Sequence, residues 1–120
     1  MHPENKEFLI ACINSCTMSV STQDGVVMYH TMMPDGRILE ICAEIFLQDT
    51  KSASIYYTIS LGDELLEDVM VDTSKKIINP IARDIIDLMR MCSTKIMMQE
   101  AHLVHSRFMV HEITNNKSYS

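Results

Sequence analysis

Glycine and proline are scarce in this chain, which contains three of each among 120 residues. A chain so poor in residues that interrupt helices and strands is not expected to be loop-rich or disordered. Three glycines also argue against a glycine-rich loop that cradles nucleotide phosphates. Low-complexity tracts, internal repeats and linker-like stretches are missing as well. We therefore expect one folded domain with one core.

Positive charge is also in short supply. Ten lysines and arginines face sixteen acids, which gives a net charge of −6, whereas contact with phosphates needs a basic surface. No apolar run approaches the roughly 18 residues of a membrane span, and residues 2–7 are polar where a secretory signal would be apolar. The composition therefore predicts a cytoplasmic protein that binds neither nucleic acid nor membranes, with four free thiols.

Catalytic signatures are missing too. The sequence has no serine elbow and no phosphate-binding loop, and Cys12-x-x-x-Cys16 has helical spacing, unlike a Cys-x-x-Cys redox or metal pair. Cys92 falls within an apolar helix face, where burial should raise its pKa and leave the thiol inert. We expect neither an enzyme nor a cofactor.

The spacing at which apolar residues recur changes along the chain. Residues 3–16 place their apolar side chains on one face of a helix, which begins at a proline suited to the first turn. From Thr17 the period becomes two, and Asp24-Gly25 and Pro34-Asp35-Gly36 provide turns. The predicted strands cover residues 17–22, 26–33, 37–47 and 52–61, with a third turn over residues 48–51. One-sided strands joined by short turns indicate an antiparallel meander with one covered face.

The next segment is ambiguous. Gly62 is predicted to end the sheet, and residues 63–72 to form a short helix, although Val69–Val71 could instead be an edge strand. A long helix over residues 77–113 follows, capped by Asn79 with Pro80 in its first turn. The predicted fold is an α+β domain over residues 1–113: an N-terminal helix, a meander of three or four strands, and a long C-terminal helix on one face of the sheet. Residues 114–120 are predicted to form a frayed tail.

The long helix has more apolar surface than a small sheet can cover. It would measure about 50 Å at 1.5 Å per residue, and its second half remains apolar. Either a second subunit covers the excess, or the helix breaks near Ser93-Thr94 and folds back. The residues predicted to form an oligomer interface are rich in methionine, which suits adaptable surfaces: Met89, Met97, Met98, Ala101, Val104 and Phe108.

Polar side chains of the same helix suggest two other sites. Four cations could line a pocket for an anionic ligand between subunits: Arg83, Arg90, Lys95 and Arg107. Alternatively, they form ion pairs along the helix, such as Asp87–Arg90 or Lys95–Glu100. His102 and His105 could share a metal ion, but a third ligand is not evident, so a structural or solvent-facing role is favoured and no metal is expected.

The order of a first helix and a strand meander, in a small acidic chain, resembles class I type III secretion chaperones, which are dimers. The resemblance covers element order only; the later pair of strands in that family is not evident here, and no residue is assigned from it. The leading hypothesis is a non-enzymatic homo-oligomer that captures, inhibits or escorts a cytoplasmic macromolecule. The alternative is a small-ligand binder that sequesters an anionic metabolite or nucleotide between subunits. A small phage host-takeover protein would fit either description.

Overall fold

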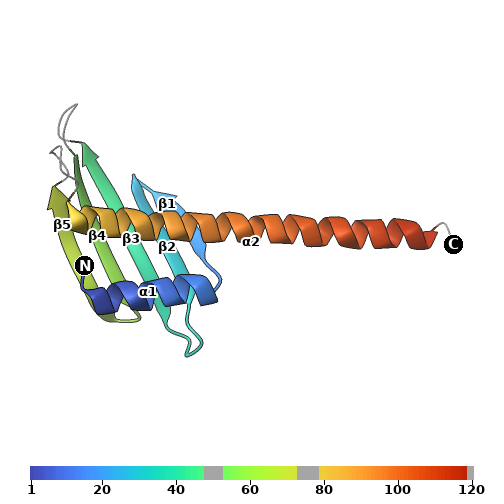
Figure 1. Ribbon diagram of the computed structural model, residues 1–120, viewed down its shortest axis with the longest axis horizontal. Coiled ribbons are helices and arrows are strands. Elements are labelled where there is room, and N and C mark those ends of the chain that lie inside the picture. Colours follow the sequence, from blue (N-terminus) through green and yellow to red (C-terminus); the bar gives the residue numbers. More distant parts are fainter. Residues whose placement is uncertain (48–52, 73–78, 119–120) are drawn as a thin grey trace.

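The computed structural model describes residues 1–47, 53–72 and 79–118. The chain is an α+β domain in which a five-stranded antiparallel sheet is covered on one face by two helices (Figure 1). The elements, in chain order, are α1 (Pro3–Ser15), β1 (Ser19–Gln23), β2 (Val26–Met32), β3 (Ile38–Leu47), β4 (Ala53–Leu61), β5 (Glu64–Asp72) and α2 (Pro80–Ser118). Among the described residues, no helix is both long enough and apolar enough to cross a membrane.

The meander predicted from the alternating pattern is confirmed, with the strands in the order β1-β2-β3-β4-β5. Asp24 and Gly25 both have positive φ, at 52° and 81°, so they make the tight β1–β2 turn expected of them. Gly36 has a φ of 89° in the β2–β3 turn. The predicted turn over residues 48–51 lies outside the described residues.

The short helix predicted over residues 63–72 is wrong, because this segment is the fifth strand, β5. Gly62 does not end the sheet. It has a φ of 59° and, with Asp63, closes a hairpin in which Leu61 pairs with Glu64. A register shift between Ile59 and Ser60 breaks the alternation of β5, which is why the strand does not show a period of two.

The core lies between the sheet and the two helices. Side chains that alternate along β3 and β4, such as Ile41 and Tyr57, are almost fully buried. Leu9 and Ile13 of α1 meet them from the other layer, and α2 adds a second apolar row. The buried residues of this row are Ala82, Ile85, Leu88 and Cys92. Their helical spacing matches one stripe of the predicted long helix.

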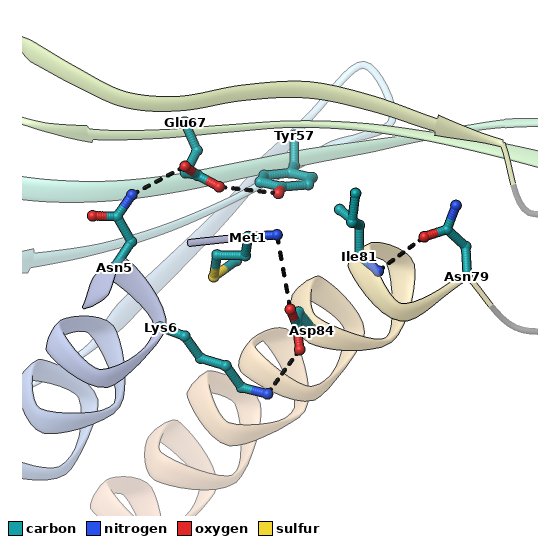
Figure 2. Close-up of polar contacts among 8 residues, drawn as sticks. All are labelled: Met1, Asn5, Lys6, Tyr57, Glu67, Asn79, Ile81 and Asp84. Atoms are coloured by element: carbon teal, nitrogen blue, oxygen red, sulfur yellow. Dashed lines mark hydrogen bonds and ion pairs between the residues drawn. The ribbon is translucent and has the colours of Figure 1, made fainter. Parts of the chain in front are cut away.

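Polar contacts fix α1 against its neighbours (Figure 2). Asn5 of α1 donates a 3.0 Å hydrogen bond to the buried carboxylate of Glu67 on β5, and the Tyr57 hydroxyl donates to the same carboxylate at 3.4 Å. Lys6 forms a 2.7 Å ion pair with Asp84 of α2. Helix α1 is therefore held on one flank of α2, the flank that carries Asp84.

Helix α2 begins as predicted, since the side chain of Asn79 accepts a 2.9 Å hydrogen bond from the Ile81 amide. The helix is unbroken at Ser93-Thr94, so the folded-back alternative is wrong. It also continues to Ser118, past the predicted end at residue 113, because neither glycine nor proline follows Pro80. At 1.5 Å per residue α2 measures about 58 Å and projects well beyond the sheet (Figure 1).

Gln99 marks the point at which α2 leaves the body of the domain. Its side-chain amide donates to the Met18 carbonyl and its side-chain oxygen accepts from the Met18 amide, both at 2.8 Å. Met18 lies immediately before β1, so α2 crosses the sheet from the β5 side to the β1 edge. Residues 100–118 of α2 lie beyond this contact, and we call them the overhang.

We expect Gln99→Ala to lower the free energy of unfolding by about 1–3 kcal/mol, because two buried backbone groups lose their partner. Chemical denaturation of the wild type and the variant measures the difference. His102→Ala, one turn further along α2 at an exposed position, is the matched control and should be nearly neutral. Equal stability of all three proteins would contradict the proposed role of Gln99.

Candidate functional site

The most unusual surface of the molecule is the part of α2 near and beyond the β1 edge. Met97, Val104 and Phe108 are 68%, 64% and 57% exposed. Together with Ala101 they are spaced by four, three and four residues, which places them on one side of the helix. We call Met97, Ala101, Val104 and Phe108 the α2 stripe. Four aligned apolar positions at this spacing are typical of a helix that packs against another helix.

The structure brings together four of the six residues predicted as an interface, namely those of the α2 stripe. Met89 is partly buried against the core and lies nearer the start of the helix. Met98 is 65% exposed, but at 100° per residue it points away from the stripe. Leu103, 51% exposed, lies on a third side, because it continues the buried line of Ile85 and Cys92 past the end of the sheet.

A groove lies between α2 and the sheet. It has a volume of about 520 Å³ and is lined mainly by apolar side chains from β2, β3, β4 and α2. Its lining includes Tyr29, Ile45, Ile55, Ile86, Met89 and Ser93. The Tyr29 hydroxyl and Ser93 Oγ lie 2.5 Å apart and link the sheet to α2 at this position. We call this depression the sheet groove.

The sheet groove lies on the flank of α2 opposite α1. Helix α1 contacts the side of α2 that carries Asp84 and Lys95, whereas Ile86 and Ser93 turn to the other side. No helix among the described residues covers that half of the sheet, and Ile45 and Leu47 are accordingly 58% and 82% exposed. The alternation of β3 predicted the face on which these side chains lie, but no sequence signal showed which half of that face the helices leave open.

The four candidate cations do not form one pocket within a single chain. Arg83 and Arg107 are separated by about 36 Å along α2 at 1.5 Å per residue. Arg90 and Lys95 line a shallow depression of about 380 Å³ beside Asn14, and Lys95 donates a 3.0 Å hydrogen bond to the Asn14 carbonyl. Within the described part of the chain, neither Asp87–Arg90 nor Lys95–Glu100 forms an ion pair. The anion pocket between subunits stays a prediction.

The cysteines and histidines that the structure describes are not gathered into one site. All four cysteines are free. Burial raises the pKa of the Cys92 thiol to about 12, as its apolar surroundings predicted, and that of Cys42 to about 11 with help from Glu40. His102 and His105 are exposed, and no three potential metal ligands cluster within the residues that the structure describes.

The thiols should differ in reactivity. In native protein at pH 8 we expect an alkylating reagent to modify the partly exposed Cys16 first and to leave the buried Cys12 and Cys92 intact. All four should react in denaturant, and peptide mass spectrometry gives the order. Native modification of Cys92 as fast as Cys16 would contradict the placement of α2.

The raised pKa of Cys92 also predicts a pH dependence. Above pH 9, the ordinary thiol pKa, the unfolded chain loses this proton while the folded chain keeps it until about pH 12. Stability should therefore fall as the pH rises from about 9 to 12. Cys92→Ala should be less stable at pH 8 but show a weaker decline over this range.

Comparison of the chain with protein-family models, with curated proteins and with solved structures finds no match in any of the three.

Proposed function

We propose that this chain is a non-enzymatic, homo-oligomeric binding protein that captures, inhibits or escorts a cytoplasmic macromolecule. The observation that supports the proposal best is the α2 stripe. Phe108, Val104 and Met97 are all more than half exposed on a helix that has left its own domain. Removing such side chains from water yields on the order of 1.5–3 kcal/mol each, so this surface favours association.

The other face of the sheet is the surface that such an oligomer would offer to the macromolecule. The helices leave this face open (Figure 1). Strand alternation places Glu40 and Glu44 on its central strand and Asp68 on β5 at its edge, and exposed apolar side chains lie around them. These are Met32, Ile38, Phe46 and Met70. A mixed acidic and apolar surface of this kind suits a protein partner with a basic patch.

The proposal is tested in two steps. Sedimentation equilibrium across the micromolar range should give a mass above that of one chain, and a monomer throughout would contradict the oligomer. The immobilised wild type should then retain one stoichiometric protein, and Glu40→Lys/Glu44→Lys should lose it. Glu4→Lys/Glu7→Lys, which changes the same number of charges on the exposed side of α1, is the matched control. Equal retention by both variants would contradict capture on the open face.

A further inference from the structure

The overhang extends past an edge strand that is open to pairing. Within the part of the chain that the structure describes, β1 pairs only with β2, and all five of its residues are exposed. Its sequence, Ser-Val-Ser-Thr-Gln, contains no charge and no proline, the usual protections of a sheet edge. The opposite edge, β5, carries four acids that would repel a second copy of itself: Glu64, Glu67, Asp68 and Asp72.

Beneath the overhang, beside β1, lies space that a continuing sheet would occupy. Leu103 lies on the same side of α2 as the buried Ile85 and Cys92, but past the end of the sheet. Val20 of β1 is 45% exposed, and it pairs with the buried Tyr29, so it lies on the face that the helices cover. Two apolar side chains from two elements therefore border the same open corner.

We propose that a second copy of this chain fills that corner, with β1 pairing antiparallel to β1 of the partner subunit and the two α2 helices lying antiparallel side by side. This inference rests on the proposed function, because it names the occupant of the α2 stripe and the arrangement of the oligomer. The two sheets then form one continuous ten-stranded sheet. Each overhang lies across the sheet of the other copy and fills its sheet groove.

The dimensions agree with this arrangement. In the register given below, residues 106–118 lie past Gln99 of the second copy and rise about 19 Å along the helix axis, while five strands spaced by 4.7–4.9 Å span about 19–24 Å. One overhang thus reaches across most of the other copy's sheet. Helix α1 of the other copy does not block the overhang. It lies on one flank of α2, whereas the sheet groove and the α2 stripe lie on the other flank. In the pair, Leu103 lies close to the twofold axis and faces the junction of the two β1 strands, near Val20.

The charges beside the α2 stripe select the register. When Ala101 lies against Val104 of the second copy, Met97 lies against Phe108, and symmetry repeats both contacts. Glu100 and Arg107 lie on the same side of the α2 stripe. In the pair, Glu100 of each copy therefore lies close to Arg107 of the other, which gives two such contacts. Both side chains are exposed in one chain. Sliding one helix past the other by a whole heptad would bring Glu100 against Glu100, which is unfavourable.

A parallel pairing of the helices is disfavoured by the same line of residues. Towards the start of α2 the stripe continues through Thr94, Arg90, Asp87 and Arg83. In a parallel pair each of these residues would meet its own copy, so Arg90 would lie against Arg90 and Asp87 against Asp87. Like charges facing each other across an interface oppose association. The antiparallel pair avoids these contacts and also brings the two β1 edges together.

A charge exchange tests the helix register. Glu100→Lys and Arg107→Glu should each raise the dissociation constant of the homodimer by roughly tenfold, because each places like charges together twice. Mixed in equal amounts, the two variants should form a heterodimer as tight as the wild type, measured by native mass spectrometry and sedimentation. No recovery in the mixture would overturn the register. Thermal unfolding of each variant checks that the domain is intact.

A cysteine cross-link tests the β1 pairing. The five residues of β1 pair completely only when Ser21 faces Ser21 of the second copy, and directly opposed residues have Cβ atoms about 4.5–5.5 Å apart. In a Cys16→Ser background, Ser21→Cys should therefore give a disulfide-linked dimer under mild oxidation. Ser19→Cys, which would face Gln23, is the control and should stay uncross-linked. An uncross-linked Ser21→Cys dimer would overturn the pairing.

The outcomes separate this inference from the proposed function. A wild-type dimer that shows neither the charge recovery nor the Ser21→Cys cross-link overturns the antiparallel arrangement and leaves a homo-oligomer. A monomer at all concentrations overturns both the arrangement and the homo-oligomer. A monomer whose α2 stripe or β1 edge is instead protected by a different captured protein overturns the second copy as the occupant.

Discussion

Val104→Glu is expected to convert the protein to a monomer. In the proposed pair each Val104 lies in an apolar layer against Ala101 of the second copy, so the substitution places an unpaired carboxylate in the interface twice. If the substitution weakens the free energy of dimerisation by several kcal/mol, the dissociation constant rises about 100-fold or more. Because Val104 is 64% exposed in the single chain, the fold of the domain should be little affected.

Met109→Glu is the matched control for this experiment. Met109 lies on the same helix and is 46% exposed, but at 100° per residue it lies outside the α2 stripe and outside the flanks that meet across the pair. Sedimentation equilibrium of the wild type and the two variants should show dissociation for Val104→Glu only. Equal weakening by both substitutions would mean that exposed apolar surface in general, and not the α2 stripe, drives association.

Ile85→Ala is expected to destabilise the folded domain more than any substitution on the α2 stripe. Ile85 is fully buried between α2 and the sheet, and truncating such a side chain costs about 2–5 kcal/mol because it leaves a cavity. For a domain of this size the melting temperature should fall by about 10 °C or more. Differential scanning calorimetry measures the change.

Ile81→Ala provides the comparison, since Ile81 is the same residue type one turn earlier on α2 and is 37% exposed. The Ile81→Ala substitution should lower the free energy of unfolding by no more than about 1 kcal/mol. If both substitutions cost the same, α2 would not pack on the sheet through the face that contains Ile85, Leu88 and Cys92.

Local patterns predicted most of the fold. The alternation of Leu39, Ile41 and Ala43 identified β3 and its buried face, and Asn79-Pro80 identified the start of α2. The prediction was wrong at residues 63–72, where Leu65, Leu66, Val69 and Met70 imitate helical spacing. A bulge beside Ser60 removes the strand period there, and the turn at Gly62 reverses the chain into another strand.

The candidate site was predictable only in part. Apolar residues on several sides of α2 indicated an uncovered helix, and four of the six residues chosen form the α2 stripe. Met89 could not be separated from them, because periodicity gives a side of the helix but not the point at which the sheet ends. Ile45 and the β1 edge were missed for a related reason: a strand pattern shows neither which neighbours are present nor which are absent.

The sequence by itself determined the elements other than β5, because caps, turns and periods act between residues close together in the chain. It determined the α+β class, the start of α2 and the apolar excess of its second half. Only the tertiary structure decided that α2 is straight, that it leaves the sheet at β1 through Gln99, and that α1 takes one flank and leaves the other open. These features depend on packing between segments far apart in the chain, and such packing has no local signature.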